Sequence, residues 1–310
     1  MAKHDTEHAY ETPLGRAFVG DAGDVLHAHC DDESVDLIVT SPPFALQRPK
    51  EYGTESQATY VEWFLSFADD FWRKLKPTGS LVIDLGGAWT AGQPVKSLYA
   101  FELLIALCNR PNKQFVLAQD FYWYNPARLP SPAQWVTIDR TRAKDAVNYV
   151  WWLGKTPNVK ADNKRVLREY TPAMKKLIES GNYNRGTRPS GHTIREGFTE
   201  DKGGSIPPNL LAISNTGNDK QYIDSCARLG LKPHPARFPP ELPEFFIEFL
   251  TEPGDLVVDP FAGSNITGAV AESHGRRWLS SDLDADYVRG SEGRFENMQL
   301  GLAHEVANGS

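Results

Sequence analysis

The sequence predicts an α/β protein in which buried strands alternate with amphipathic helices. Three stretches support this prediction. Residues 35–40, Val-Asp-Leu-Ile-Val-Thr, indicate a buried parallel strand, because apolar residues follow one another almost without interruption. Residues 60–75 repeat apolar side chains at steps of three and four, which is typical of a helix with one buried face. Residues 255–273 combine an apolar strand, a glycine-bearing turn and the start of a helix.

The first half of the chain supplies four more elements. Residues 1–12 are polar and irregular and are expected to form a loose terminus. A short strand at 16–20 and a buried strand at 80–84 are bounded by turn residues. A helix is expected at roughly 97–107, and residues 115–124 form a long aromatic strand.

The second half begins with a strand at 148–153, which Gly154 closes. Residues 155–219 show no strong periodicity. A helix follows at 241–250, with phenylalanine and leucine on its buried side. After the strand and glycine turn at 255–268, residues 269–273 open a helix and residues 277–280 form a last strand.

Length and composition restrict the possible functions. The 310 residues allow one large domain with an insertion, or two domains. The net charge of −7 argues against a uniformly basic nucleic-acid binder. The three cysteines, Cys30, Cys108 and Cys226, lack metal-ligand spacing, so neither a disulfide framework nor a metal site is expected, and a reducing cytoplasm fits. No export signal or membrane span is expected.

Ser41-Pro42-Pro43-Phe44 follows the strand at 35–40 directly. Two prolines fix φ and remove two amide donors, so the strand ends here in a stiff turn. The turn offers a hydroxyl, carbonyl oxygens and an aromatic face at the edge of the sheet where ligands bind. The alternative is a purely structural turn with a buried Phe44.

The glycine turn after the strand at 255–259 indicates a cofactor that contains adenosine. Gly263 allows close backbone approach, and Asp282, about twenty residues on, is placed to accept hydrogen bonds from ribose hydroxyls. The turn lacks the Gly-x-Gly-x-x-Gly pattern, which favours a cofactor without a pyrophosphate. S-adenosylmethionine is such a molecule, and its cationic sulfonium suits the nearby Asp259. The alternatives are strand-end hydrogen bonding for Asp259 and a helix cap for Asp282.

Residues 155–202 form a basic segment within an acidic chain. They contain eleven Lys or Arg and six Asp or Glu, a local net charge of +5 against −7 for the whole chain. Arginines, a histidine, a tyrosine and glycines alternate between residues 183 and 195, a mixture that suits phosphates and base edges. The alternative is a solvated loop.

Taken together, these segments resemble the amino-methylating DNA methyltransferases. Val-Asp-Leu-Ile-Val-Thr-Ser-Pro-Pro-Phe is similar to the catalytic motif of that family, and Asp-Pro-Phe-Ala-Gly-Ser-Asn to its cofactor motif. The catalytic motif comes first, by about 220 residues, which is the permuted order of the beta group. The resemblance covers nearly the whole chain. It is strongest to the PvuII-type cytosine-N4 methyltransferases, through Phe-Tyr-Trp-Tyr-Asn-Pro, Gly-Gly-Ser-Ile-Pro-Pro-Asn-Leu-Leu and His-Pro-Ala-Arg-Phe-Pro.

The resemblance implies a Rossmann-like S-adenosylmethionine-dependent fold with a seven-stranded mixed sheet in permuted order. It implies a catalytic part at 13–156, an inserted target-recognition region at 157–230 and a cofactor-binding part at 231–300. Methyl transfer from S-adenosylmethionine to N4 of a flipped cytosine is the expected reaction. The implied catalytic residues are Ser41, Pro42, Pro43, Phe44 and Asp84. The implied cofactor-binding residues are Asp21, Arg237, Phe238, Asp259, Phe261, Gly263, Ser264, Asn265, Thr267 and Asp282.

Some of these residues have an alternative role or depart from the pattern of the family. Asp84 is the candidate proton acceptor, or else a structural carboxylate bonded to the glycine amides after it. The local sequence favours a turn or cap role for Asp21, whereas the resemblance implies a position near the adenine. Phe238 stands where relatives often have Lys, so contact with the cofactor there can be through backbone alone. Asn265 replaces a common glycine, which would narrow the approach to the ligand.

Double-stranded DNA is the expected partner. Six basic residues are the candidate contacts: Arg48, Lys50, Arg185, Arg188, His192 and Arg195. The resemblance implies a restriction-modification system with a paired endonuclease, a bacterial or archaeal cytoplasm, a monomer or weak dimer, and a palindromic target such as CAGCTG. Adenine N6 methylation and a catalytically idle DNA-binding relative stay as alternatives. Methylation at cytosine carbon 5 is unsupported, because no Pro-Cys pair supplies a thiolate.

Overall fold

The computed structural model describes residues 8–45, 56–181, 186–187, 193–194, 196–217 and 219–296. Among these residues, one nine-stranded sheet has the order β1-β2-β11-β10-β3-β4-β6-β5-β9. The strands are β1 (His8–Glu11), β2 (Gly15–Val19), β3 (Val35–Thr40), β4 (Leu75–Gly86), β5 (Val116–Tyr124), β6 (Val147–Gly154), β9 (Leu210–Ala212), β10 (Leu256–Asp259) and β11 (Arg277–Asp282). The five neighbouring strands β2, β11, β10, β3 and β4 are parallel, whereas β6 is antiparallel to both β4 and β5.

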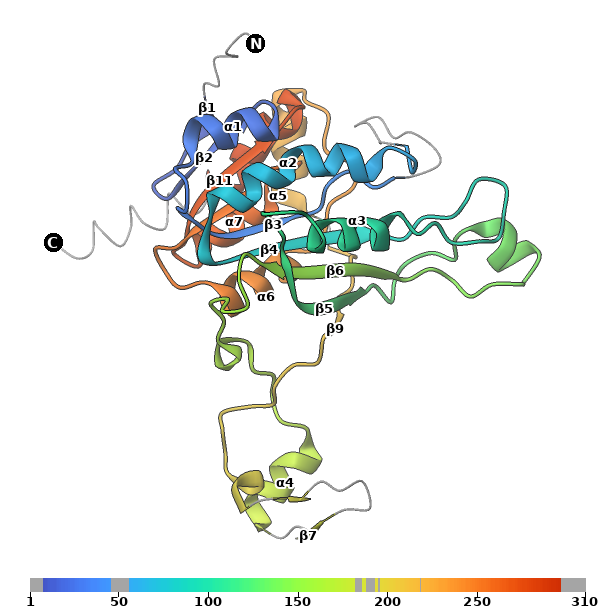
Figure 1. Cartoon of the computed structure of the whole chain (residues 1–310), viewed down its shortest axis with the longest axis vertical. Helices are drawn as coiled ribbons and strands as arrows, with labels where there is room; N and C mark the ends of the chain where they lie inside the picture. Colours follow the sequence, from blue (N-terminus) through green and yellow to red (C-terminus); the bar gives the residue numbers. More distant parts are fainter. Residues whose placement is uncertain are drawn as a thin grey trace, which may run out of the picture. The chain divides into compact units, whose positions relative to one another are not determined.

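Helices cover both faces of this sheet. One face carries α1 (Ala22–His29), α2 (Tyr60–Lys74) and α3 (Tyr99–Cys108), and Figure 1 shows α2 and α3 across the strands from α6. The other face carries α6 (Glu241–Leu250), α7 (Ile266–Ser273) and α8 (Ala285–Ser291), and α5 (Lys220–Leu229) packs on α8.

The sequence of β3 explains this three-layer arrangement. All six residues of β3 are buried, as expected for a central parallel strand. Ile38 packs into the core beneath α1, α2 and α3, while Leu37 and Val39 pack into the core beneath α6 and α7. Side chains alternate across a strand, so one apolar run supplies both hydrophobic cores.

The α/β class and the mixed sheet are confirmed, but the expected count of seven strands is too low. The two short outer strands β1 and β9 account for the difference. Residues 1–12 were expected to form a loose terminus, yet β1 pairs with β2. Tyr10 holds β1 in place: the side chain is buried, its hydroxyl lies 2.6 Å from Ser291 Oγ, and it accepts a hydrogen bond from Asn265 Nδ2 at 2.8 Å.

The chain divides into two compact units. The main unit contains residues 1–161 and 209–310, and the smaller unit contains residues 162–208. The smaller unit ends before β9, which joins the large sheet, and before α5, which packs on α8. The target-recognition region expected at 157–230 stays a prediction and extends beyond this unit at both ends. Within the smaller unit lie α4 (Pro172–Ser180) and a two-stranded sheet of β7 (Gly186–Thr187) and β8 (Thr193–Ile194). Among the described helices, none is long and apolar enough to cross a membrane.

Candidate active site

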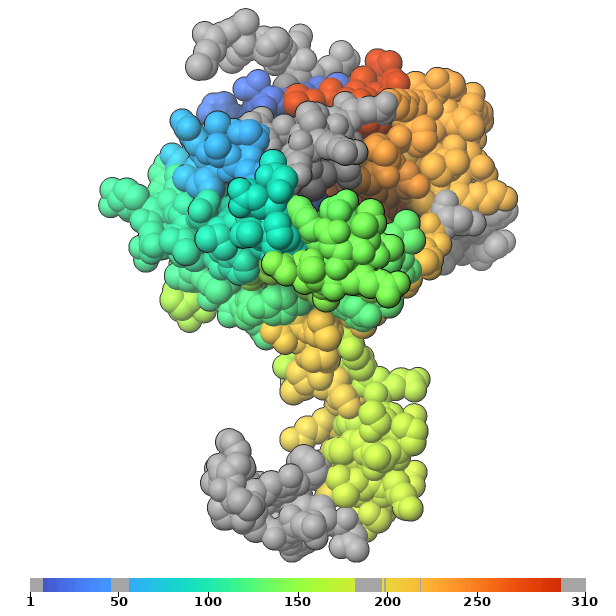
Figure 2. Space-filling model, turned by 90° about the vertical axis from the view of Figure 1, so that its right-hand side faces the viewer, coloured from blue at the N-terminus to red at the C-terminus, as the bar shows by residue number. Residues whose placement is uncertain are grey.

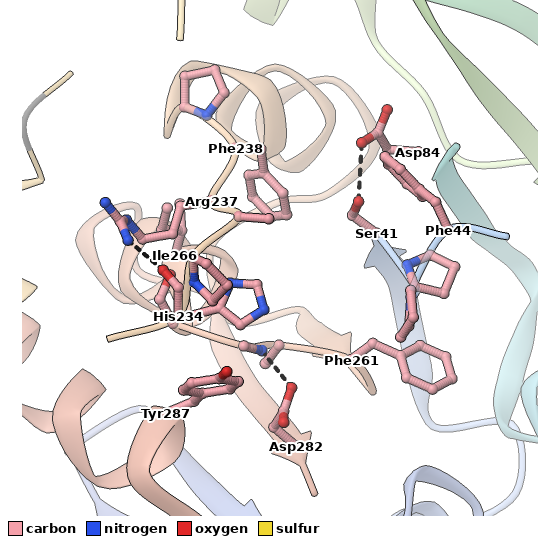
Figure 3. Close-up of a pocket in the computed structure, with 18 of the residues that line it drawn as sticks. Ser41, Phe44, Asp84, His234, Arg237, Phe238, Phe261, Ile266, Asp282 and Tyr287 are labelled. Carbon is pink, nitrogen blue, oxygen red and sulfur yellow. Dashed lines mark hydrogen bonds between the residues drawn. The ribbon is translucent and has the colours of Figure 1, made fainter. Parts of the chain in front are cut away.

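A cavity of about 680 Å³ lies in the main unit, where the parallel strands end. Gly20, Ser41, Asp84, Phe261 and Asp282 line it, each at or just beyond the carboxyl end of a different strand. This edge of an open α/β sheet is the usual ligand-binding position. The two motifs, about 220 residues apart in the chain, therefore lie at one cavity, as Figure 3 shows.

Ser41 and Asp84 meet at one end of the cavity. Ser41 Oγ donates a hydrogen bond to Asp84 Oδ2 at 3.0 Å (Figure 3). The parallel pairing of β3 with β4 brings their ends together and so places the two side chains side by side. Burial raises the pKa of Asp84 to about 6, although hydrogen bonds from Asn148 and Ser41 and the nearby charge of Arg128 partly oppose this rise.

Asn148 and Arg128 extend this contact, and the sequence-based prediction missed both. Asn148 Nδ2 donates to both carboxylate oxygens of Asp84, at 3.0 and 3.2 Å, and Asn148 Oδ1 accepts from Arg128 Nη1 at 2.9 Å. Asn148 is buried opposite the end of β4 because β6 runs antiparallel to it. Asp84 thus has side-chain partners rather than the glycine amides considered from the sequence.

Phe44 and its two prolines form the adjoining wall. Pro42, Pro43 and Phe44 all line the cavity. The ring of Phe44 lies so close to Gly86 that a Cβ there would come within 2.6 Å of it. A glycine at the end of β4 therefore allows the aromatic ring to sit against the strand.

Asp282 and Gly263 lie at the opposite end of the cavity. Gly263 N donates to Asp282 Oδ2 at 2.8 Å, and burial raises the pKa of the Asp282 carboxyl group. Gly263 has a φ of +51°, a conformation that favours glycine, and a Cβ there would lie 3.2 Å from the His234 ring. Asp21 also lines the cavity, and its Oδ1 accepts from Gly23 N at 2.8 Å as the cap of α1. Asp21 is therefore a helix cap that also lines the cavity, and its contact with a cofactor stays a prediction.

Asp259, Asn265 and Thr267 are buried beside the cavity rather than in its lining. Asp259 accepts hydrogen bonds from Thr40 Oγ1 and Thr267 Oγ1, both at 2.6 Å. Burial raises the pKa of Asp259 to about 6. Asn265 caps α7 by accepting from Gly268 N at 3.1 Å, in a left-handed conformation that asparagine tolerates. These side chains hold the glycine turn, so Asn265 does not narrow the cavity.

The remaining predicted cofactor residues line the cavity: Phe261, Ser264, Arg237 and Phe238. Phe261 packs against Trp63 and Phe67 of α2, with ring centroids 5.6 and 5.3 Å apart. Arg237 Nε lies 2.9 Å from Asp219, whose carboxylate also binds Arg294 through two hydrogen bonds of 2.6 and 2.7 Å. Asp219 and Arg294 carry no motif signal in the sequence, because folding alone brings them together.

These groups fit S-adenosylmethionine. Two carboxylates, Asp21 and Asp282, are acceptors for ribose hydroxyls, and the aromatic rings of Phe261 and Trp63 offer faces for an adenine. Arg237 and Arg294 supply positive charge suited to a carboxylate. The six basic residues expected to contact DNA lie outside the described residues: Arg48, Lys50, Arg185, Arg188, His192 and Arg195.

Comparison with known proteins gives consistent results. A family model described as DNA methylase matches residues 35–293. The type II methyltransferase M.PvuII of Proteus hauseri is 53% identical over 95% of this chain and 88% of the relative. A solved PvuII DNA methyltransferase (cytosine-N4-specific) has a TM-score of 0.75 and 44% identity, covering 99% of this chain and 97% of that one.

Two further matches concern the target base and the fold. The DNA adenine methyltransferase YhdJ of Escherichia coli (strain K12) is 36% identical over 89% of this chain and 81% of the relative. The structure of M1.HpyAVI in complex with SAM has a TM-score of 0.53 and 18% identity, covering 91% of this chain and all of that one. At that identity the match to M1.HpyAVI shows the fold alone.

Proposed function

The chain belongs to the DNA methylase family, and from that premise we propose that it methylates the N4 amino group of cytosine in duplex DNA with S-adenosylmethionine as methyl donor. The Ser41–Asp84 contact at the cavity carries this proposal, because it places two acceptors where an exocyclic amino group must be held. The similarity to the PvuII DNA methyltransferase, which is cytosine-N4-specific, supports the choice of base.

Asp21, Asp282, Phe261 and Gly263 would hold the cofactor, and Arg237 lies where its carboxylate would be bound. When bound, S-adenosylmethionine supplies an electrophilic methyl group. The chain has to exclude water and align the two reactants, because direct attack by nitrogen needs no covalent enzyme intermediate. The aromatic side chains that line the cavity suit the exclusion of water, and the residues named above suit the alignment of the reactants.

Ser41, Pro42 and Asp84 would activate the amino group. Its lone pair is delocalised into the ring, so the nitrogen becomes nucleophilic only when its protons are directed to acceptors and it can pyramidalise. The Ser41 hydroxyl, the Pro42 carbonyl and the Asp84 carboxylate are such acceptors. Phe44 would stack on the base and fix its plane.

Asp84 would then receive the proton that the methylated nitrogen releases. With a pKa of about 6, the carboxyl group is largely ionised at neutral pH and yet basic enough to accept this proton. Asn148 would orient the carboxylate, because its amide holds both oxygens.

The target cytosine is paired inside a duplex and would have to be flipped into the cavity. Residues 162–208 and the predicted basic contacts would bind the DNA and read its sequence, with CAGCTG as the first duplex to test. We also propose that the enzyme protects host DNA beside a restriction endonuclease, in the cytoplasm of a bacterial or archaeal cell, as a monomer or weak dimer.

Labelled S-adenosylmethionine, defined duplexes and nucleoside analysis test the proposed reaction. We expect labelled N4-methylcytosine. The 36% identity to an adenine methyltransferase makes N6-methyladenine the second candidate product, and its exclusive appearance would overturn the choice of cytosine. Unlabelled DNA after incubation with duplexes of every sequence context would instead favour the idle DNA-binding alternative.

A further inference from the structure

Arg128 is a cation at the base-binding end of the cavity for which the proposed reaction has no role. Its side chain is half-buried and lines the cavity, and its Nη1 donates to Asn148 Oδ1 at 2.9 Å. A guanidinium group carries five N–H donors in one plane, and this hydrogen bond uses one of them. A polar ligand edge in the cavity would therefore meet further donors from the same group.

The turn after β5 holds Arg128 in place. Asn125 Oδ1 accepts from Ala127 N at 3.1 Å, and Arg128 N donates to Asn125 O at 3.2 Å, which closes the turn. Lys144 Nζ donates to the Arg128 carbonyl at 3.2 Å. Figure 2 shows the green loop of residues 126–146 beside the turquoise segment of residues 88–98, and Trp89 and Trp135 join them, with ring centroids 5.3 Å apart. The backbone that carries Arg128 is thus supported on two sides.

Asp84 and Arg128 both contact the Asn148 amide, so an acceptor and a donor lie at the same end of the cavity. A flipped base that carries an amino donor beside a ring acceptor would meet both groups. In cytosine a single carbon separates the amino donor N4 from the ring acceptor N3, and a second acceptor, O2, lies beyond N3. Adenine presents the same amino and ring nitrogens, but a carbon-bound hydrogen stands in place of O2.

We infer that Arg128 donates hydrogen bonds to N3 and O2 of the flipped cytosine and thereby selects cytosine over adenine. This inference rests on the proposed function. With the amino group at Ser41 and Asp84, two acceptors of cytosine face a planar group with several donors, whereas adenine offers one acceptor. Arg128 therefore recognises the base, in addition to fixing the Asn148 amide.

The test compares Arg128→Met with the unchanged protein on duplexes that carry cytosine or 3-deazacytosine at the target position. The analogue keeps the amino group and O2 but has C–H in place of N3. We expect the analogue to lower kcat/KM roughly 10- to 100-fold for the unchanged protein, the range of a lost base-edge contact. Arg128→Met should lose at least this factor on cytosine and a smaller factor on the analogue, because the N3 contact is already absent there and only the O2 contact is left to lose.

If 3-deazacytosine lowered kcat/KM by the same factor in both proteins, the inference would be overturned. Arg128 would then act only through Asn148 and Asp84. Unchanged kcat/KM on cytosine would also overturn it. Arg142→Met is the matched control, since Arg142 lies on the same loop and its guanidinium donates to the carbonyls of Pro94 and Thr141. Arg128→Lys controls for misfolding of Arg128→Met, because it keeps a charged donor at this position. It should recover part of the kcat/KM that Arg128→Met loses on cytosine. An unchanged protein that methylates no cytosine at all would instead disprove the proposed function.

Discussion

The Asp84 carboxyl group illustrates how single residues are adjusted for function. Burial penalises its charged form, and donors from Asn148 and Ser41 compensate only in part, so its pKa stays near 6. Its partial compensation keeps it basic enough to accept a proton.

Asp84→Asn separates this chemical role from stability. The amide can still accept from Asn148 and contact Ser41, so the packing is preserved. We expect kcat to fall roughly 10²- to 10⁴-fold, the usual contribution of a positioned proton acceptor, with unchanged cofactor affinity. Single-turnover methylation and calorimetric cofactor binding measure the two effects. Asp70→Asn, in a surface ion pair with Arg73, serves as control, and a variant of Asp84 with full activity would contradict the assignment.

The raised pKa of Asp84 also predicts two pH dependences. The rate of methyl transfer should rise with pH through about 6, as the carboxylate forms. Stability should change in the opposite direction: between about pH 4 and pH 6 the folded state keeps a proton that the unfolded state has released, so the free energy of unfolding falls as pH rises. Asp84→Asn should reduce this fall, as urea unfolding at pH 4, 6 and 8 would reveal. A rate profile flat from pH 5 to 8 would oppose the proposed role.

At the scale of elements, the Asp259 carboxylate links β10 to β3 and α7 through hydrogen bonds. It ends β10, and it accepts hydrogen bonds from Thr40 at the end of β3 and from Thr267 in the first turn of α7. The catalytic turn follows Thr40 directly, and the cofactor turn lies between Asp259 and Thr267. One buried carboxylate thus fixes the relative position of both turns.

Thr267→Val removes the hydrogen bond to Asp259 with little change in the shape of the side chain. Asp259 would lose one of its donors while still buried, so we expect the protein to lose about 1–3 kcal/mol of unfolding free energy. Cofactor affinity should fall as well, because the glycine turn would lose a fixed end. Urea unfolding checks the first effect and calorimetry the second. Thr216→Val, an exposed threonine, should change stability by no more than about 0.5 kcal/mol, and equal stability of both variants would argue against this link.

Sequence patterns predicted the central elements well and the residue partnerships less completely. The bounds of β3 and α6 agree with prediction, since each is a clear apolar run or repeat. Asn148 could not be assigned, because its approach to Asp84 depends on the antiparallel register of β6 against β4. Arg128 could not be assigned either, because it joins the site through its contact with Asn148. Short outer strands such as β1 were missed because a few residues carry too little periodicity.

At the scale of the whole molecule, the two units differ in how they can be stable. The main unit has two large hydrophobic cores on either side of its sheet. Residues 162–208 are few, and α4 contains no buried residue. A unit of this size has little apolar surface to bury and gains little stability from its own core. Its basic composition, together with this thin core, suits a segment that binds DNA more than one that supports the catalytic unit.

Replacing residues 162–208 with a flexible Gly/Ser linker tests this division of roles. Every described residue that lines the cavity belongs to the main unit, so we expect cooperative unfolding and cofactor binding to persist. The preference for the target sequence over unrelated duplex should disappear, a loss of roughly 10³-fold or more, because the contacts that distinguish bases would be gone. Circular dichroism, calorimetry and methylation of matched duplexes provide the three measurements. A shortened protein that still methylates its target selectively would place sequence recognition in the main unit.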